Sequence, residues 1–219
     1  MKFFIDSANL DEIKQVAEMG LVDGVTTNPT LLAKEGKGFK QTIQEICSIV
    51  DGPVSAEVVT SDNAEQMLKE AHIVSSWHKN VVVKIPFGPE GMKAVRKLSE
   101  EGIKTNVTVL FTVTQALIAA KAGATFLSNF VGRVDDLSGD GMVAVRDTVN
   151  MVHEYDFKSE VLVASVRSPQ HIVEAVRAGA QIATIPFKVL NQLYQHPLTT
   201  SGIAQFTADW QKSGLSFDS

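Results

Sequence analysis

The feature that most constrains the fold is a regular alternation of short apolar runs with longer amphipathic stretches along all 219 residues. Eight runs are rich in β-branched or aromatic residues and are flanked by residues that favour turns or helix caps. They are residues 3–5, 24–27, 54–59, 81–85, 105–109, 125–130, 161–165 and 182–185. Short runs separated by helical stretches predict parallel strands that are covered by helices.

The number of runs favours a closed (β/α)8 TIM barrel, in the α/β class. A barrel of this kind commonly uses a chain of this length as one domain, so we predict one domain over residues 1–219. An open, doubly wound sheet is the alternative. No Gly-x-Gly-x-x-Gly pattern follows the first run, which weakens the dinucleotide-binding form of that alternative.

An extra C-terminal helix is expected beyond the eighth run. The pattern predicts one helix over about 188–195, a break at His196-Pro197 and a final helix over about 202–212. Ile203, Phe206 and Trp210 share one face of that final helix. This face packs either on the chain's own barrel or on a neighbouring subunit.

Composition excludes several classes of protein. Apolar residues make up 44% and charged residues 21%, which is typical of a globular chain. The net charge is −5 and there is no basic run, so nucleic acid is not expected as a partner. No apolar run is long enough for a membrane span. Cys47 is the single cysteine, and the first six residues lack a signal-peptide core. We therefore expect a cytoplasmic protein.

A metal site is not expected. The five histidines, at positions 72, 78, 153, 171 and 196, form no i, i+4 pair and do not accompany the cysteine. Asp135, Asp136 and Asp140 lie in a Gly/Ser-rich stretch, and we expect a solvated loop there.

Polar residues inside the apolar runs indicate a functional site. Side chains alternate between the two faces of a strand, and in a barrel one face points inward. The predicted inward polar set is Asp6, Asn28, Glu57, Lys84, Asn106, Thr108, Ser128, Ser165 and Arg167. The same alternation predicts that Val109, Leu162 and Ala164 point outward. Most of the polar set lies near the carboxyl ends of the strands, where TIM barrels carry their active sites.

Lys84 is the one lysine within an apolar strand, in Val82-Val-Lys84-Ile-Pro. Burial disfavours the charged form of an amine, and a neutral amine can attack a carbonyl and form a Schiff base. Asp6 and Glu57 could then transfer protons through a water held by Thr108. The alternative is a structural ion pair between Lys84 and Glu57 or Asp6.

Two arginines follow the sixth and seventh strands, in Phe130-Val-Gly-Arg133 and in Ser165-Val-Arg167. Guanidinium groups bind phosphate through two parallel hydrogen bonds, and phosphate sites of this fold lie near this end. The helix that begins at Ser168-Pro169 adds amides that favour anions. Surface salt bridges are the alternative for each arginine.

The sequence resembles the transaldolases, and in particular their small, single-domain bacterial and archaeal branch. Segments along nearly the whole chain carry the resemblance. They are Phe4-Ile-Asp6-Ser-Ala-Asn, Asp23-Gly-Val-Thr-Thr-Asn28-Pro-Thr, Ser55-Ala-Glu57-Val, Val82-Val-Lys84-Ile-Pro, Gly102-Ile-Lys-Thr-Asn106-Val-Thr108, Phe130-Val-Gly-Arg133 and Ala164-Ser165-Val-Arg167.

The resemblance implies a class I enzyme without a metal or other cofactor. It would transfer a dihydroxyacetone unit from fructose 6-phosphate or sedoheptulose 7-phosphate to erythrose 4-phosphate or glyceraldehyde 3-phosphate, in the pentose phosphate pathway. Lys84 matches the Schiff-base lysine, and Asp6 the acid/base at carbon–carbon cleavage. Glu57 and Thr108 match the pair that holds the catalytic water.

The resemblance also implies substrate-binding residues and an assembly. Asn28 and Asn106 match residues that bind the dihydroxyacetone part, while Ser128 and Phe130 match residues that line the pocket. Members of the small branch commonly form homo-oligomers, either pentamers or decamers.

The implied phosphate site consists of Arg133, Ser165 and Arg167.

Fructose-6-phosphate aldolase, a lyase, is the nearest alternative activity. That branch typically has glutamine, tyrosine and lysine where this chain has Glu57, Phe130 and Arg167. A non-catalytic phosphosugar-binding ring protein is the other alternative. Asn129 stands where proline is common in the family, and alternation predicts that it points outward.

Overall fold

A computed structural model describes residues 1–217 as a closed barrel of eight parallel strands, in which each strand pairs with the next and β8 pairs with β1. The strands are β1 Lys2–Asp6, β2 Gly24–Thr26, β3 Val54–Glu57, β4 Val81–Pro86, β5 Thr105–Leu110, β6 Phe126–Phe130, β7 Glu160–Ala164 and β8 Ile182–Ile185. The predicted (β/α)8 architecture is confirmed, and the open sheet is excluded.

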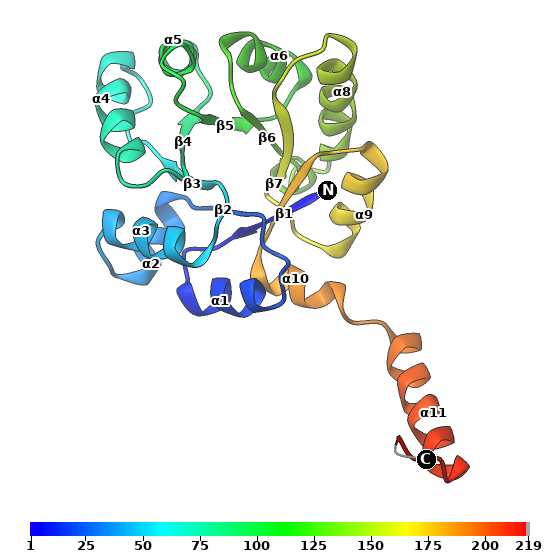
Figure 1. Ribbon diagram of the computed structural model, residues 1–219. Coiled ribbons are helices and arrows are strands. Elements are labelled where there is room, and N and C mark those ends of the chain that lie inside the picture. The colour runs from blue at the N-terminus through cyan, green and yellow to red at the C-terminus, as the bar shows by residue number, and fades with distance from the viewer. Residues whose placement is uncertain (218–219) are drawn as a thin grey trace.

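Helices surround the barrel, which Figure 1 shows nearly end-on. They are α1 Leu10–Glu18, α2 Pro29–Glu35, α3 Phe39–Ile49, α4 Ala64–Ser75, α5 Pro89–Glu100, α6 Val113–Ala122, α7 Gly132–Asp135, α8 Gly141–Glu154, α9 Pro169–Ala178, α10 Phe187–Leu193 and α11 Pro197–Ser213. Their ends follow local chemistry. Asn9 caps α1 by accepting from the amides of Asp11 and Glu12, and Gly123 ends α6 in the left-handed conformation at φ 96°.

Two apolar layers follow from strand alternation. An outer layer between strands and helices contains residues such as Val54, Val83 and Leu127. A smaller inner cluster fills the barrel with Phe4, Val82, Phe126, Leu162, Ala164 and Ile182. On β1, β4, β6 and β8 an inner apolar residue lies two positions before an inward polar one. The inner apolar cluster therefore fills the amino end of the barrel, and polar side chains line the carboxyl end of the strands.

Alternation fails at the ends of β5 and β7, where the outward prediction for three residues is wrong. Val109 has φ 64° within an irregular register, and it lines the central pocket beside Thr108. Ser165 has φ 59° after β7, and both Ser165 and Ala164 line the pocket. Leu162 belongs to the inner cluster. A left-handed residue turns two consecutive side chains toward the same side, which period-two reasoning does not anticipate.

Asn129 points outward, as predicted, and the structure accounts for its polarity. It is 1% exposed, and its Nδ2 donates to Thr148 Oγ1 of α8 at 3.2 Å. A strand-to-helix hydrogen bond therefore takes the place of apolar packing at this position.

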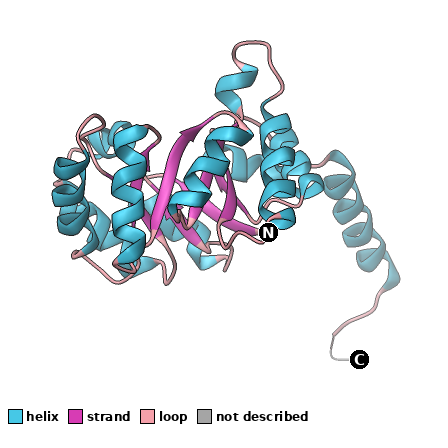
Figure 2. Ribbon diagram, turned by 90° about the horizontal axis from the view of Figure 1, so that it is seen from above, coloured by secondary structure: helices cyan, strands magenta, loops and turns pink. Residues whose placement is uncertain are grey.

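The final helix, α11, extends away from the barrel, as Figures 1 and 2 both show. It begins at Pro197, earlier than predicted, because His196 caps it and proline suits the first turn. None of its residues is buried, and Phe206 is 75% exposed. Packing of the Ile203, Phe206 and Trp210 face on the chain's own barrel is thus excluded. Within residues 1–217, no helix has the length and apolar character needed to span a membrane.

Candidate active site

A polar pocket of about 390 Å3 opens at the carboxyl ends of the strands. Ten of the eleven predicted site residues line it, namely Asp6, Asn28, Glu57, Lys84, Thr108, Ser128, Phe130, Arg133, Ser165 and Arg167. Asn106 does not line it and is 0% exposed. Closure of the barrel brings together side chains from β1 to β7 that are far apart in sequence.

Lys84 lies at the floor of the pocket and is 6% exposed. Its Nζ is 3.0 Å from Glu57 Oε2 and donates to the main-chain oxygen of Thr27 at 3.0 Å. Glu57 and Lys84 are register partners on neighbouring strands and point the same way. The ion pair considered as the alternative role of Lys84 therefore exists, with Glu57 as the partner, and it faces the cavity rather than a closed core.

Asp6 shares the floor with two threonines. Thr26 Oγ1 donates to Asp6 Oδ1 at 2.9 Å and lies 2.6 Å from Thr184 Oγ1. Burial raises the pKa of Asp6, although Lys84 and the Thr26 hydroxyl act to lower it. Thr26 and Thr184 are not among the predicted site residues, although strand alternation on the second and eighth strands indicates that both point inward.

A chain of hydrogen bonds supports the floor from below. Ser128 Oγ donates to Asn106 Oδ1 at 2.7 Å, and Asn106 Nδ2 donates to Ser55 Oγ at 3.0 Å. Asn106 is also the register partner of Lys84. Its amide therefore holds neighbouring strands together beneath the pocket and orients Ser128, which does line the pocket.

Thr108 Oγ1 is buried and has no hydrogen-bond partner among the described residues. Buried hydroxyl groups normally have a partner, so this hydroxyl is suited to hold a water or a substrate atom.

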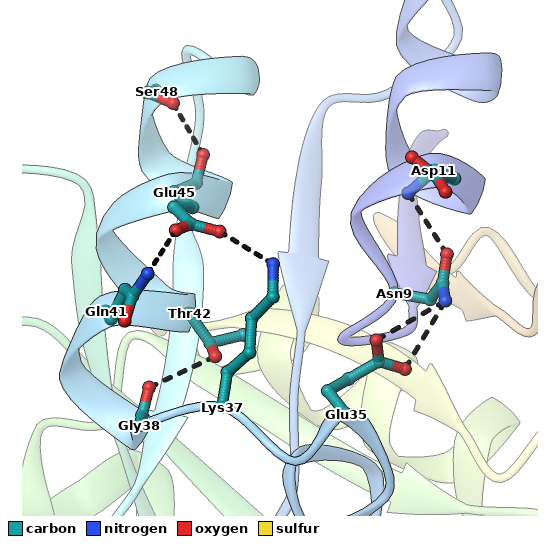
Figure 3. A network of polar contacts seen from close by, with 9 residues as sticks. All are labelled: Asn9, Asp11, Glu35, Lys37, Gly38, Gln41, Thr42, Glu45 and Ser48. Atoms are coloured by element: carbon teal, nitrogen blue, oxygen red, sulfur yellow. Dashed lines mark hydrogen bonds and ion pairs between the residues drawn. The ribbon is translucent and has the colours of Figure 1, made fainter.

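The mouth of the pocket is formed partly by α2, which contributes Pro29, Thr30 and Leu31. Asn28 caps this helix by accepting from the amide of Leu31 at 3.0 Å. Polar contacts secure the segment after it, as Figure 3 shows. Glu35 accepts from Asn9 Nδ2 at 3.4 Å, and Lys37 donates to Glu45 of α3 at 3.2 Å. No residue of α2 is buried, so apolar packing does not hold this helix in place. The polar contacts connect α2 and the segment after it to α1 and α3.

The opposite rim carries the two arginines. The Arg133 guanidinium lies over the Phe130 ring, 5.0 Å from its centroid. Arg167 Nη2 donates to Asp136 Oδ2 at 3.2 Å, and both side chains are more than half exposed. Gly132 allows this packing, because a Cβ there would lie 2.1 Å from Ser165 O and 2.6 Å from Arg167 Cγ. The rim is therefore cationic and partly open to solvent.

The predicted solvated loop is confirmed for residues 136–140, which are exposed and lie outside the helices, but the prediction is wrong for Asp135. Asp135 belongs to α7, and its Oδ2 lies 2.6 Å from His171 Nε2 on α9. Asp136 pairs with Arg167, and Asp140 caps α8 by accepting from the amide of Met142. Residues 135 and 171 are 36 positions apart, so no local pattern indicated this contact.

Comparison with known proteins agrees with this geometry. The model of the family described as transaldolase/fructose-6-phosphate aldolase matches residues 3–217. A relative from Thermodesulfovibrio yellowstonii, named "Probable transaldolase", is 60% identical over 97% of this chain and 99% of its own. A relative of the same name from Methanococcus maripaludis is 58% identical over 96% of this chain and 98% of its own. Another, from Thermoanaerobacter sp., is 54% identical over 98% of this chain and 99% of its own.

A solved structure of thiamine phosphate pyrophosphorylase from Pyrococcus furiosus shares the fold, with a TM-score of 0.56. It is 15% identical and covers 84% of this chain and 85% of its own, so the likeness concerns the barrel alone. The match over residues 3–217 and the identity of 54–60% decide the family. The chain belongs to the transaldolase/fructose-6-phosphate aldolase family.

Proposed function

We propose that this protein is a transaldolase, which transfers a dihydroxyacetone unit from a ketose phosphate to an aldose phosphate through a Schiff base on Lys84. The observation that carries the proposal is the position of Lys84. Its amine is buried, pairs with Glu57 at 3.0 Å and faces a pocket that also contains Asp6 and has two arginines at its rim.

Schiff-base formation starts when the Lys84 ammonium passes a proton to Glu57, 3.0 Å away, and the neutral amine attacks the ketose carbonyl carbon C2. The proton that the nitrogen then loses passes to the carbonyl oxygen, and the proton held by Glu57 is available for the loss of water. The resulting carbinolamine loses water and becomes an iminium ion. The unpartnered Thr108 hydroxyl supports a role in holding that water, with Glu57 moving its proton.

Carbon–carbon cleavage needs a base at the C4 hydroxyl. Asp6 takes that proton, the C3–C4 bond breaks, and its electrons pass into the iminium to give an enamine. The first aldose phosphate leaves. A second aldose phosphate then accepts the enamine carbon, Asp6 returns the proton, and water hydrolyses the new iminium. The raised pKa of Asp6 supports this role, because it brings the carboxyl closer to the operating pH.

The remaining predicted residues bind the sugar phosphates. Arg133 and Arg167 hold the phosphate together with Ser165, which lies in the same loop as Arg167. Asn28 and Ser128, which line the pocket, bind the dihydroxyacetone unit, and Phe130 contributes an apolar ring to the lining. We assign Asn106 an indirect contribution through Ser128, since it is buried below the pocket.

The test is borohydride reduction of the protein in the presence of fructose 6-phosphate. We expect a donor fragment attached to Lys84, identified by mass spectrometry of its peptide. Lys84→Met should give no adduct and no transfer to erythrose 4-phosphate. The matched control Lys93→Met removes a surface lysine that pairs with Glu90, and it should retain both. An adduct on another residue would contradict the proposal.

The second candidate activity is that of fructose-6-phosphate aldolase, which the family description also includes. Glu57, Phe130 and Arg167 favour transfer over this activity, since the aldolase branch typically has glutamine, tyrosine and lysine at these positions. Free dihydroxyacetone formed rapidly from fructose 6-phosphate without an acceptor would decide for the aldolase. Tight sugar-phosphate binding with no turnover would indicate a non-catalytic protein.

We also propose a cytoplasmic homo-oligomer, either a pentamer or a decamer. The exposed apolar residues of α11 support the assembly, because a helix with no buried residue gains stability by packing on a partner. The single, buried Cys47 is compatible with a reducing compartment.

A further inference from the structure

His171 connects the two loops that carry the rim arginines. Its Nδ1 accepts from the main-chain amide of Arg167 at 3.0 Å, and its Nε2 lies 2.6 Å from Asp135 Oδ2. The side chain is 11% exposed. Asp135 follows Arg133 by two residues on α7, and its other oxygen accepts from the amide of Gly141 at 2.9 Å.

These contacts determine how the ring is protonated. Nδ1 accepts a hydrogen bond, so it carries no proton, and the proton of the neutral ring lies on Nε2. Nε2 therefore donates to the Asp135 carboxylate. The imidazole ring thus connects the Arg167 amide to the Asp135 carboxylate, and both ring nitrogens have a hydrogen-bond partner.

The two loops also touch directly. The Gly132 amide donates to the main-chain oxygen of Ser165 at 3.0 Å, and the Arg167 side chain packs over Gly132. The two hydrogen bonds of His171 add a second connection between the same two segments. Together, these interactions determine the separation and direction of the main chain at Arg133 and Arg167.

We propose that His171 is a positioning residue for phosphate recognition, which sets the Arg167 main chain against the Arg133 loop so that both guanidinium groups can bind one phosphate. The proposal rests on the proposed function, because the phosphate belongs to the sugar substrate. His171 does not line the pocket and takes no part in the Schiff-base chemistry.

Two isosteric substitutions separate the two contacts of the ring. His171→Asn keeps an acceptor near the position of Nδ1, whereas His171→Gln places its amide near Nε2 and removes the acceptor for Arg167. We expect His171→Gln to raise the KM for fructose 6-phosphate and the inhibition constant of inorganic phosphate about tenfold. His171→Asn keeps the Arg167 amide contact but loses the Asp135 contact, so it breaks the other end of the bridge and should raise both values by a similar factor.

A second readout distinguishes positioning from general damage. Dihydroxyacetone carries no phosphate, so borohydride trapping of it on Lys84 should proceed at the wild-type rate in both variants. The matched control is His72→Gln, the same substitution at a surface histidine whose Nε2 lies 2.6 Å from Glu101 and which does not line the pocket. It should leave every value unchanged.

Two results would overturn the inference. One is an unchanged KM and phosphate inhibition in folded His171→Gln. The other is a parallel loss of dihydroxyacetone trapping, which would mean that the histidine supports the whole site. Failure of the proposed function is distinguishable, since the wild-type protein would then form no adduct with fructose 6-phosphate.

Discussion

At the scale of single residues, the floor of the pocket combines three ionisable groups that folding brings into one small volume. Lys84 and Glu57 pair at 3.0 Å, and Asp6 lies beside a threonine pair. Burying such groups costs stability unless each has a partner. The arrangement therefore predicts measurable effects on stability as well as on catalysis.

Removing one member of the ion pair should destabilise the protein more than removing both. Lys84→Met leaves Glu57 without its cation, and we expect it to lower the free energy of unfolding by about 2 to 4 kcal/mol. Lys84→Met combined with Glu57→Gln should recover at least half of that loss. Denaturant unfolding of the two single variants and the double variant measures the coupling. Additive losses would show that the pair contributes nothing to stability.

Asp6→Asn should stabilise the folded protein at neutral pH while greatly reducing the rate of transfer. Burial raises the folded-state pKa of Asp6, so the folded state binds a proton more tightly than the unfolded chain does. Stability is then lost as pH rises from the ordinary value of 3.8 through the raised folded value. Asparagine carries no charge and still accepts from Thr26, so this loss disappears.

Thermal unfolding of Asp6→Asn and the wild type at several pH values tests whether the substitution raises or lowers stability. The difference in midpoint should favour the variant at neutral pH and shrink in acid. Activity should fall about 100- to 10,000-fold, as expected when a general acid/base is lost. A variant less stable than the wild type at neutral pH would contradict the expectation.

At the scale of elements, the ends of β5 and β7 depart from regular strand geometry. Val109 is a β-branched residue at φ 64°, a conformation that costs of order 1 to 3 kcal/mol. The departure lets Thr108 and Val109 line the pocket together. Strain at this strand end therefore positions functional side chains.

Glycine at position 109 should be tolerated unusually well for a strand residue. Val109→Gly relieves the left-handed strain but adds glycine entropy and loses apolar contact, so we expect a change below about 1 kcal/mol in unfolding free energy. Val107→Gly, on the same strand and 0% exposed, should lose about 3 kcal/mol. Chemical denaturation of both variants gives the comparison. Equal losses would indicate that Val109 carries no strain.

At the scale of the whole molecule, the barrel is closed upon itself while α11 stands apart from it. The inner and outer apolar layers are complete without any residue of this helix. Substitutions on α11 can therefore change the contacts of this helix without changing the stability of the barrel.

Phe206→Glu should weaken assembly and leave the barrel intact. The side chain is 75% exposed, so the charge meets water in an isolated chain, but it would be buried against a partner. We expect light scattering to show a lower mass at about micromolar concentration, with unchanged far-UV circular dichroism. Asp209→Glu, on the same helix, keeps its charge and should retain the wild-type mass.

Much of this arrangement follows from local sequence. Alternation places Glu57, Lys84 and Ser128 inward because side-chain direction on a strand has a period of two residues. It also indicates an outward Asn129, which the structure confirms. Alternation gives the wrong direction for Val109, Leu162 and Ala164. Left-handed residues at positions 109 and 165 interrupt the period, and no feature of the runs indicates where that occurs.

Local patterns in the chain are enough to predict the alternation of strands and helices and most of the side chains that face the pocket, because each depends on a few neighbouring residues. Which polar groups meet depends on the closed barrel. It pairs Asp135 with His171 and Thr26 with Thr184, places Asn106 beneath the pocket, and leaves α11 exposed. The physical reason is that closing the barrel joins residues that are far apart along the chain, and their distances depend on every strand between them.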